Sequence, residues 1–309
     1  MKTIGVALAA YNGAAYLPAL LDSLRRQSDP DFTVLWQDDG SSDGTAELLR
    51  DVSDKDSRFV PGAEQGLRLG AKGNFLSLMR QLDTPLTALC DQDDVWHADR
   101  LAAGRAALEA AEDGTGAPLL AHGDCRLIDA SGQVLAPSFF RHQGWSPAAV
   151  SLAPLLVQNN VTGCTVTMNA ALRRLVCAHA DPGRIFMHDW FLAQTAAAFG
   201  RVVFIRGALV DYRQHSGNAI GASAGGMLTR AAGALRNRDR IRERMALNYR
   251  QAQVLLDAYG DGLPAEAAAC VRAFLATQRM PKARRVLALR KGGYRMQSVP
   301  ARVGQFLFG

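Results

Sequence analysis

Three carboxylates stand close together in the stretch LTALCDQDDVW (residues 86–96), directly after an apolar run: Asp91, Asp93 and Asp94. Two like charges about 4 Å apart repel by roughly 4 kcal/mol at an effective dielectric constant near 20, so such a cluster needs water, a cation or a shifted proton. A solvated helix N-terminus is the plain explanation, since acidic residues favour that position. The alternative explanation is a bound divalent cation, because hard cations prefer carboxylate oxygens.

A second group of polar side chains follows two earlier apolar runs. Tyr11 comes after the first run, and Asp38 and Asp39 open the segment DDGSSDGT (residues 38–45) after the second. Such residues suit a nucleotide, because an aromatic ring can stack on a base and carboxylates can accept hydrogen bonds from a base or ribose. A turn before a capped helix explains DDGSSDGT equally well. Neither G-x-G-x-x-G nor G-x-x-x-x-G-K-[ST] occurs, which argues against a Rossmann dinucleotide site or a P-loop.

The elements that position these side chains alternate between apolar runs and helical periodicity over the first 226 residues. This alternation is typical of a largely parallel sheet covered by helices. The sequence predicts strands over residues 3–10, 32–37 and 86–90, and helices around residues 17–24, 45–52, 75–82 and 95–113. The acidic groups therefore follow strand ends, at the sheet edge where open α/β sheets bind ligands.

Composition sets the broad class of the protein. With 309 residues, 48% of them apolar and 21% charged, the chain can bury a sizeable core. The five cysteines are odd in number and form no C-x-x-C pair, so we expect neither a disulfide framework nor a zinc knuckle, but a cytoplasmic protein. The opening MKTIGVALAAYNG has some features of a signal peptide but fits the first strand better. No apolar run approaches the roughly 20 residues of a membrane span.

Charge is unevenly distributed along the chain. Residues 1–226 carry 19 Lys and Arg against 24 Asp and Glu, whereas residues 227–309 carry 16 against 5. The glycine-rich stretch at residues 217–227 is a plausible flexible boundary between these regions. In residues 227–253 apolar and basic side chains follow helical spacing, so this segment could lie on an anionic membrane. A helix packed on the rest of the protein, with a solvated basic face, is the alternative.

Several motifs occur together in one order along residues 3–221: VALAAYNGAAYLPALLDSLRRQ, VLWQDDGSSDGT, LGAKGNFLSL, ALCDQDDVW, NNVTGCTVTMN, HDWF and YRQHSGN. Together they resemble family 2 glycosyltransferases of the GT-A fold, and bacterial rhamnosyltransferases most of all. The resemblance implies a catalytic domain over residues 1–221, with a nucleotide-binding half (about 1–115) and an acceptor-side half (116–221). Residues 222–309, outside it, form a basic helical C-terminal region.

The resemblance also implies roles on the donor side. Asp91 and Asp93 form the Asp-x-Asp motif of the family, in which Asp93 binds Mg²⁺ or Mn²⁺ and Asp91 holds the ribose or a metal-bound water. Asp94 would only cap the following helix. His215 is a tentative further ligand of the metal or the diphosphate, with a purely structural role as the alternative. The nucleotide itself would be bound by Tyr11, Asp39, Asp38 as a second choice, and Lys72.

On the acceptor side, NNVTGCTVTMN (residues 159–169) resembles a strand beneath the acceptor site. Asp189 occupies the position of the catalytic base, at a helix N-terminus that would keep it ionised; a helix cap is the alternative. The residues expected to border the sugar and acceptor pocket are Thr162, Gly163, Cys164, His188 and Trp190, although Cys164 could equally be an ordinary buried cysteine.

The implied activity is inverting, metal-dependent transfer of a sugar from a nucleotide diphosphate to a hydroxyl group. Rhamnose from dTDP-rhamnose is the favoured donor on similarity alone. The expected acceptor is a growing surface glycan, free or lipid-linked, and the basic tail leaves attachment to the inner face of the cell membrane open. A nucleotide-sugar-binding protein without activity is one alternative. A nucleic-acid-binding protein, suggested by the sequence pI near 9.3, is the weaker one, because the basic charge has few interleaved aromatics; we expect no nucleic acid partner.

Overall fold

The structure is a computed structural model that describes residues 3–215 and 238–308. The described residues form a nine-stranded sheet with the order β3-β2-β1-β4-β8-β6-β9-β5, and β7 pairs with β6 beside this path. The strands are β1 Ile4–Ala10, β2 Phe32–Asp38, β3 Phe59–Pro61, β4 Leu86–Asp91, β5 Val95–Trp96, β6 Leu119–Ile128, β7 Val134–Ala136, β8 Thr167–Asn169 and β9 Arg201–Arg213.

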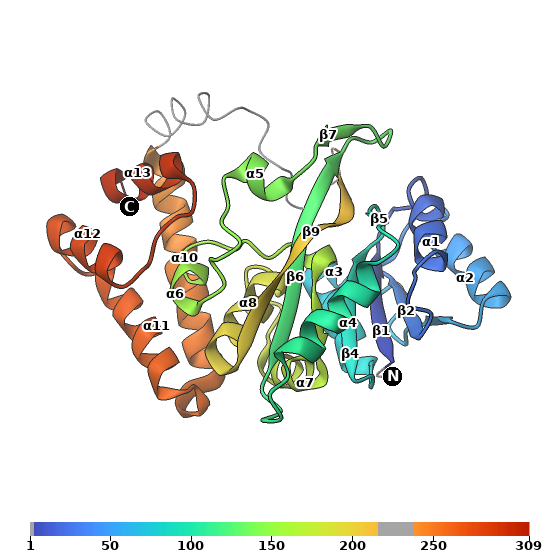
Figure 1. Cartoon of the computed structure of the whole chain (residues 1–309), viewed down its shortest axis with the longest axis horizontal. Coiled ribbons are helices and arrows are strands. Elements are labelled where there is room, and N and C mark those ends of the chain that lie inside the picture. The colour runs from blue at the N-terminus through green and yellow to red at the C-terminus, as the bar shows by residue number, and fades with distance from the viewer. Residues whose placement is uncertain (1–2, 216–237, 309) are drawn as a thin grey trace.

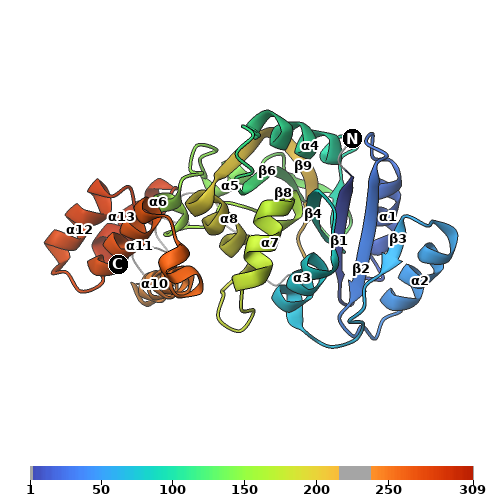
Figure 2. The same cartoon turned by 90° about the horizontal axis from the view of Figure 1, so that it is seen from below.

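Helices cover both faces of this sheet, as Figures 1 and 2 show. The helices are α1 Leu17–Arg25, α2 Thr45–Lys55, α3 Gly70–Gln81, α4 Arg100–Ala111, α5 Phe139–Gln143, α6 Leu152–Leu155, α7 Ala170–His179, α8 His188–Phe199, α10 Arg238–Tyr259, α11 Ala265–Thr277, α12 Lys282–Lys291 and α13 Val299–Phe308. Two 3₁₀ turns complete the elements, η1 at Gly163–Thr165 and η2 at Gly260–Gly262.

The first four strands are parallel and confirm the predicted alternation of strand and helix. β1 lies between β2 and β4, and its residues are buried on both faces of the sheet. Because side chains alternate along a strand, Ile4, Val6 and Leu8 pack on one core and Ala7 and Ala9 on the other. α1 and α4 cover the first face and α3, α7 and α8 the second.

The second half of the sheet is less regular. β6 and β9 form a long parallel pair, whereas β8 runs antiparallel to both β4 and β6. The sheet is therefore mostly parallel, as expected. The expectation of one strand over residues 159–169 is wrong, because a loop and η1 precede β8, which covers only the last three of these residues.

The C-terminal helices extend the core on the side of α6 and α8 (Figure 2). Met245, Tyr249 and Leu255 of α10 are buried in the same hydrophobic cluster as Phe191 of α8. In its described part, α10 is thus the packed helix that the sequence offered as the alternative to a membrane-bound one. The stretch at residues 217–227 and the start of the predicted basic helix lie outside the described residues. Among those described, no helix has the length and apolar character needed to span a membrane.

Candidate active site

The carboxylates of the DQDD segment lie at the carboxyl end of β4, as predicted. In the register of the sheet, Asp91 of β4 is opposite Ala9, and Asp38 of β2 is opposite Ala10. The segment that follows β9 reaches the same edge. There Nε2 of His215 lies 2.8 Å from Oδ2 of Asp93, and the imidazole stacks on Tyr16 with 4.8 Å between ring centroids. The structure thus brings together two groups that are 122 residues apart in the chain.

Arg213 holds the acidic segment in place from the end of β9. Its backbone N–H donates to Oδ1 of Asp94 at 3.0 Å, and its Nε donates to the carbonyl of Asp93 at 2.8 Å. Its guanidinium also lies over the ring of Tyr16. The expectation that Asp94 caps the next helix is wrong, because α4 begins at Arg100 after Asp99 and Asp94 is bound by β9 instead.

Burial makes the cluster of Asp91, Asp93 and Asp94 electrostatically unfavourable when all three side chains are charged and no cation is bound. Burial, with the charges of Asp93 and Asp189, raises the pKa of Asp91 to about 8. Burial and the charges of Asp93 and Asp91 also raise the pKa of Asp94 well above its usual range. Oδ2 of Asp94 accepts no hydrogen bond within the described parts of the chain. An oxygen-rich, crowded set of this kind fits a hard divalent cation, which would relieve the repulsion.

Asp189 faces this cluster from the first turn of α8. Its charge contributes to the raised pKa of Asp91, so the two carboxyl groups lie close enough to interact. Burial raises the pKa of Asp189 to about 7, although hydrogen bonds from Trp190, Asn159 and Gly163 favour its charged form. Burial thus opposes the expected effect of the helix N-terminus on the ionisation of Asp189.

Gly163 borders Asp189, and its place in an acceptor pocket stays a prediction. A Cβ atom on Gly163 would lie 3.7 Å from Cβ and 3.9 Å from Oδ2 of Asp189. Thr162 precedes it, and the carbonyl of Thr162 accepts hydrogen bonds from Thr165. Residue 163 therefore lies directly against Asp189, at ordinary van der Waals distance.

The neighbours of Asp189 in the HDWF motif point into the core. His188 is buried and stacks on Phe75 with 4.3 Å between ring centroids, and burial lowers its pKa to about 3. The indole of Trp190 is buried too, and its Nε1 donates to the carbonyl of Leu155 at 2.5 Å. Both residues support the wall behind Asp189 instead of presenting polar groups to an acceptor.

Arg100 supports the other part of this wall. Its side chain is fully buried, lies over Trp96, and donates to the carbonyls of Cys164 and Val166 and to the hydroxyl of Thr167. Burial lowers its pKa to about 10, so it stays charged at neutral pH. The guanidinium therefore adds to the strand bond that Leu89 gives the carbonyl of Val166, and it fixes the loop beneath Gly163 through the carbonyl of Cys164. Cys164 itself is buried, with its thiol near Asp91 and Asp94.

The predicted nucleotide-binding residues lie along the same edge of the sheet, but they differ in exposure and in hydrogen bonding. Tyr11 is 53% exposed, so its ring is free to stack on a base. Asp38 accepts from the backbone N–H groups of Gly40 and Ser41 and from the hydroxyl of Ser41, so it stabilises the turn. Asp39 accepts from the N–H groups of Leu69 and Gly70, at 2.5 and 2.7 Å. Asp39 thus fixes the start of α3 beside Tyr11.

Lys72 projects from the first turn of α3 toward the loop before α8. Its Nζ donates to the carbonyl of Ile185 at 2.8 Å. It lines a hollow of about 230 Å³ whose other residues include Arg184, Phe186 and Arg250. The positive charges of Lys72, Arg184 and Arg250 make this hollow suited to an anionic group.

Reasoning from sequence missed three residues of the site: Tyr16, Arg100 and Arg213. Arg213 stands in the YRQHSGN motif and Tyr16 in the first motif, so a basic and an aromatic residue next to assigned positions were the available signals. Nothing in the local sequence marks Arg100, because its function depends on carbonyl groups 64 and 66 residues away.

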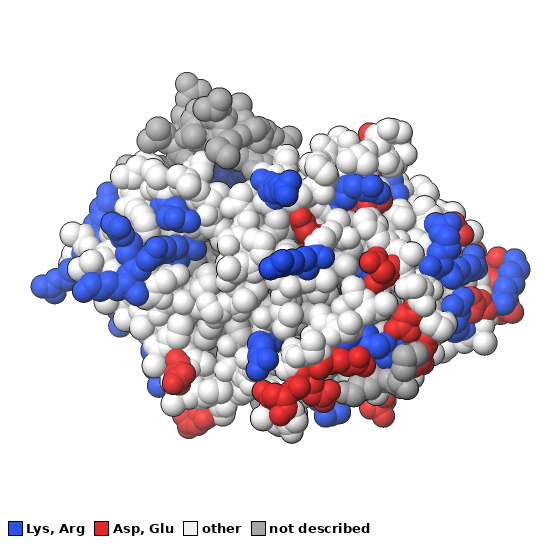
Figure 3. Space-filling model, viewed as in Figure 1, with Lys and Arg blue, Asp and Glu red and all other residues white. Residues whose placement is uncertain are grey.

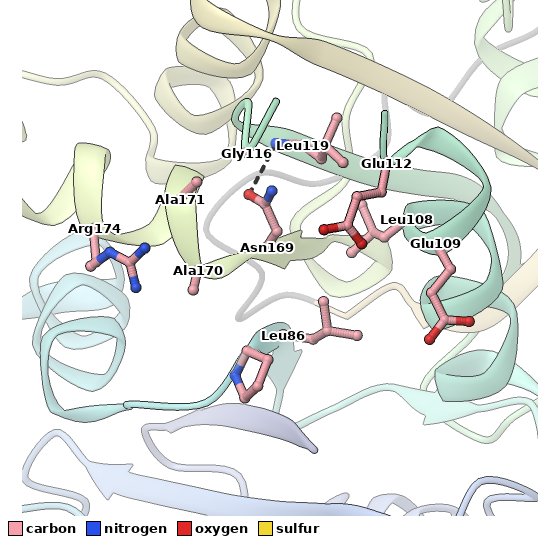
Figure 4. A pocket seen from close by; sticks show the side chains of 11 residues that line it. Leu86, Leu108, Glu109, Glu112, Gly116, Leu119, Asn169, Ala170, Ala171 and Arg174 are labelled. Atoms are coloured by element: carbon pink, nitrogen blue, oxygen red, sulfur yellow. Dashed lines mark hydrogen bonds between the residues drawn. The ribbon is translucent and has the colours of Figure 1, made fainter. Parts of the chain in front are cut away.

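A second hollow lies at the opposite end of β4 (Figure 4). It measures about 240 Å³, and Leu86, Leu108, Glu109 and Arg174 are among its lining residues. The amide of Asn169, bonded to the N–H of Leu119, stands between them. Because Leu86 begins β4 and Asp91 ends it, this hollow is remote from the carboxylate cluster and plays no part in the site.

The sequence model of the family described as "Glycosyl transferase family 2" matches residues 6–176, which is more than half of the chain. The chain belongs to glycosyltransferase family 2. This glycosyltransferase is 24% identical over 234 residues to the dTDP-rhamnosyl transferase RfbG of Shigella flexneri. The aligned region covers 70% of this chain and 74% of RfbG. The resemblance to rhamnosyltransferases inferred from the motifs is thereby confirmed.

Solved structures show the same fold. The crystal structure of S. aureus TarS 1–349 in complex with UDP-GlcNAc matches with a TM-score of 0.58 and 15% identity, over 98% of this chain and 88% of that one. A longer TarS chain matches with a TM-score of 0.54, and there the glycosyltransferase described here spans 48% of the length. The predicted GT-A fold with a helical C-terminal region is confirmed.

Proposed function

We propose that this glycosyltransferase is inverting and metal-dependent, and that it transfers rhamnose from dTDP-rhamnose to a hydroxyl group of a cell-surface glycan. The likeness to RfbG supports this donor. The TarS structure, which contains UDP-GlcNAc, supports a nucleotide-sugar donor in general. A glycan carried on a lipid is the acceptor we favour, and a cytoplasmic location stays a prediction.

One observation carries the proposal: two separate acidic groups approach each other from different elements. Asp91 and Asp93 stand at the end of β4 beside His215, and Asp189 stands on α8 close enough to raise the pKa of Asp91. A donor diphosphate held at the first group would present its sugar to the second. A single displacement needs this arrangement, because the attacking hydroxyl must approach opposite the leaving group.

Asp189 is the group that we assign as the general base. Its pKa of about 7 makes the carboxyl group partly ionised at neutral pH, and an ionised carboxylate with this basicity is well matched to accept a hydroxyl proton. The hydrogen bond from the N–H of Trp190 fixes one carboxylate oxygen, at 2.6 Å.

Asp93 and Asp91 would hold a Mg²⁺ or Mn²⁺ ion, with His215 as a further ligand. Such an ion, when bound, neutralises the charge that develops on a departing diphosphate. The residues of the chain contribute the rest: Arg213 fixes the acidic segment through the carbonyl of Asp93, and Tyr16 fixes the imidazole of His215. The exposed ring of Tyr11 would stack on the base, and Lys72, in the first turn of α3, would approach an anionic group.

The test is a donor panel with the purified protein and Mn²⁺ or Mg²⁺. We expect mass spectrometry to show slow hydrolysis of dTDP-rhamnose, or transfer to a glycan acceptor, in preference to UDP-GlcNAc and GDP-mannose. NMR of the product should show the anomeric configuration opposite to that of the donor. Donor binding without any turnover would instead identify a binding protein without activity, and retention of configuration would remove the inverting mechanism.

A further inference from the structure

The C-terminal end of the molecule carries an apolar stripe that faces solvent. Val299, Val303 and Leu307 of α13 are 67%, 51% and 43% exposed. They are spaced four residues apart, so they lie along one face of the helix. On α12, Leu287 is exposed as well. A row of exposed apolar side chains along one helix face, as on α13, marks an interaction site more often than scattered single residues do.

The orientation of α13 is fixed by polar contacts on its inner face. Oε1 of Gln305 accepts from the N–H of Met296 and its Nε2 donates to the carbonyl of Tyr294, each at 2.9 Å. The guanidinium of Arg302 donates to the carbonyls of Met296 and Gln297. Because Gly304 and Gln305 are buried against the protein, the valine and leucine side chains of the opposite face are held outward.

The surroundings of this stripe are strongly basic. Residues 267–309 contain nine Lys and Arg and no Asp or Glu. Figure 3 shows Lys and Arg side chains gathered over the end of the molecule that α11, α12 and α13 form in Figure 1. Lys282, Arg284, Arg290 and Lys291 of α12 are exposed, and none has an ion-pair partner among residues 3–215 and 238–308.

We propose that the α12–α13 surface, Leu287, Val299, Val303 and Leu307 with the cations of α12, docks on an anionic lipid bilayer. Apolar side chains flanked by lysine and arginine are suited to the headgroup region of such a membrane. A second copy of the chain is a poor occupant, because apposing two such faces would bring like charges together. The surface lies within the C-terminal region (222–309) that the sequence offered for membrane attachment, but outside the segment 227–253, whose described part packs on α8.

Docking at this end would also orient the candidate active site. Oε1 of Gln297, between α12 and α13, accepts from the N–H of Ser146, and the N–H of Gln297 donates to Oε1 of Gln158, both at 2.8 Å. Residues 146–160 lead directly into the loop that carries Gly163. The membrane-docked helices are therefore tied to the acceptor side of the enzyme, which suits a lipid-linked acceptor; this last step rests on the proposed function.

The experiment is flotation of the full chain with vesicles of phosphatidylcholine alone or with 30% phosphatidylglycerol, without donor or acceptor. We expect binding only to the anionic vesicles, weakened by raising the salt from about 50 to 300 mM. The variant Lys282→Glu/Lys291→Glu should bind about 20-fold more weakly or worse. The variant Val299→Ser/Val303→Ser/Leu307→Ser should bind about 10-fold more weakly. Circular dichroism checks that each variant is folded.

Matched controls carry the same changes elsewhere on the surface. Val60→Ser/Val134→Ser/Leu135→Ser removes equally apolar exposed side chains, and Arg25→Glu/Arg206→Glu reverses two exposed charges outside the basic end. Both should bind vesicles as the wild type does. Absent binding, equal binding to neutral vesicles, or wild-type binding by the serine variant would overturn the proposal. So would a dimer in light scattering that the serine variant dissociates. None of these readouts needs turnover, so failure of the proposed function is recognised separately, in the donor panel.

Discussion

The two sides of the candidate active site are built from different kinds of structure. The donor side rests on parallel strands: Asp91 ends β4 in register with β1, and Asp38 ends β2. The acceptor side rests on irregular segments, with Gly163 in a 3₁₀ turn and Asp189 in the first turn of α8 after a loop. Strand pairing positions the first group, whereas buried side chains such as Arg100 and Trp190 position the second.

This difference teaches how each side can fail. A substitution at the strand ends should remove chemistry and leave the fold intact, because backbone pairing holds the strands. A substitution behind the acceptor side should cost stability, since single side chains satisfy several buried carbonyls there. The predictions that follow test this contrast.

The largest effect is expected for Asp93→Asn, on the donor side. Loss of one charged ligand should lower transfer by at least about 10³-fold and weaken donor binding as well. The melting temperature should stay close to that of the wild type, because Asp93 is held through its carbonyl by Arg213. Steady-state kinetics with a titration of Mn²⁺, and calorimetry with dTDP, measure the two effects. Asp113→Asn, in an exposed loop, is the control. Full activity in EDTA would contradict the metal assignment.

The second-largest loss of activity is expected for Asp189→Asn. Removal of a general base costs about 10²- to 10³-fold in turnover, whereas the affinity for the donor should change little because Asp189 faces the acceptor. Single-turnover kinetics and donor titration separate these terms. If donor binding falls as far as it does in Asp93→Asn, the two groups do not have separate functions and the division into two sides is wrong.

Arg100→Met tests the construction of the acceptor side. The change leaves the buried carbonyl of Cys164 without the donor that Arg100 supplies, and it removes one of the two donors to the carbonyl of Val166, the other being the N–H of Leu89. We therefore expect the free energy of unfolding to fall by about 3 kcal/mol. Chemical denaturation measures it. Arg58→Met is a control on the donor side, because Arg58 pairs with Asp56 at a half-exposed site. An equal, small loss for both variants would show that the wall behind Gly163 does not depend on Arg100.

The same contrast explains what the sequence could predict. Apolar runs and turn residues are local signals, so β1, β2, β4 and the edge that carries Asp91 and Asp93 could be predicted from them. Residues 159–169 also have an apolar, β-branched pattern, yet most of them form a loop and a turn. One contribution comes from Arg100 of α4, which donates to the carbonyl of Cys164 in place of a neighbouring strand. No local pattern contains that information.

Burial was equally hard to predict for the HDWF motif. His188 and Trp190 flank a polar carboxyl group, and both were expected to border the sugar and acceptor pocket. The periodicity of α8 turns them inward, where Trp190 bonds Leu155 and His188 stacks on Phe75. That burial also raises the pKa of Asp189. The sequence therefore identified the candidate base but not the environment that sets its basicity.

The smallest predicted effect is the dependence of activity on pH. A general base acts in its ionised form, and burial raises the pKa of Asp189 to about 7. The ionised fraction therefore rises about tenfold between pH 6 and pH 8, and kcat/KM for the acceptor should rise by the same factor.

The assay needs saturating Mn²⁺, because the pKa of about 8 for Asp91 makes metal binding itself sensitive to pH. Donor affinity measured over the same range shows whether saturation holds. In Asp189→Asn the residual activity should no longer follow this rise. A variant that keeps the full slope would assign the titration to the donor side, and the acceptor side would then lose its base.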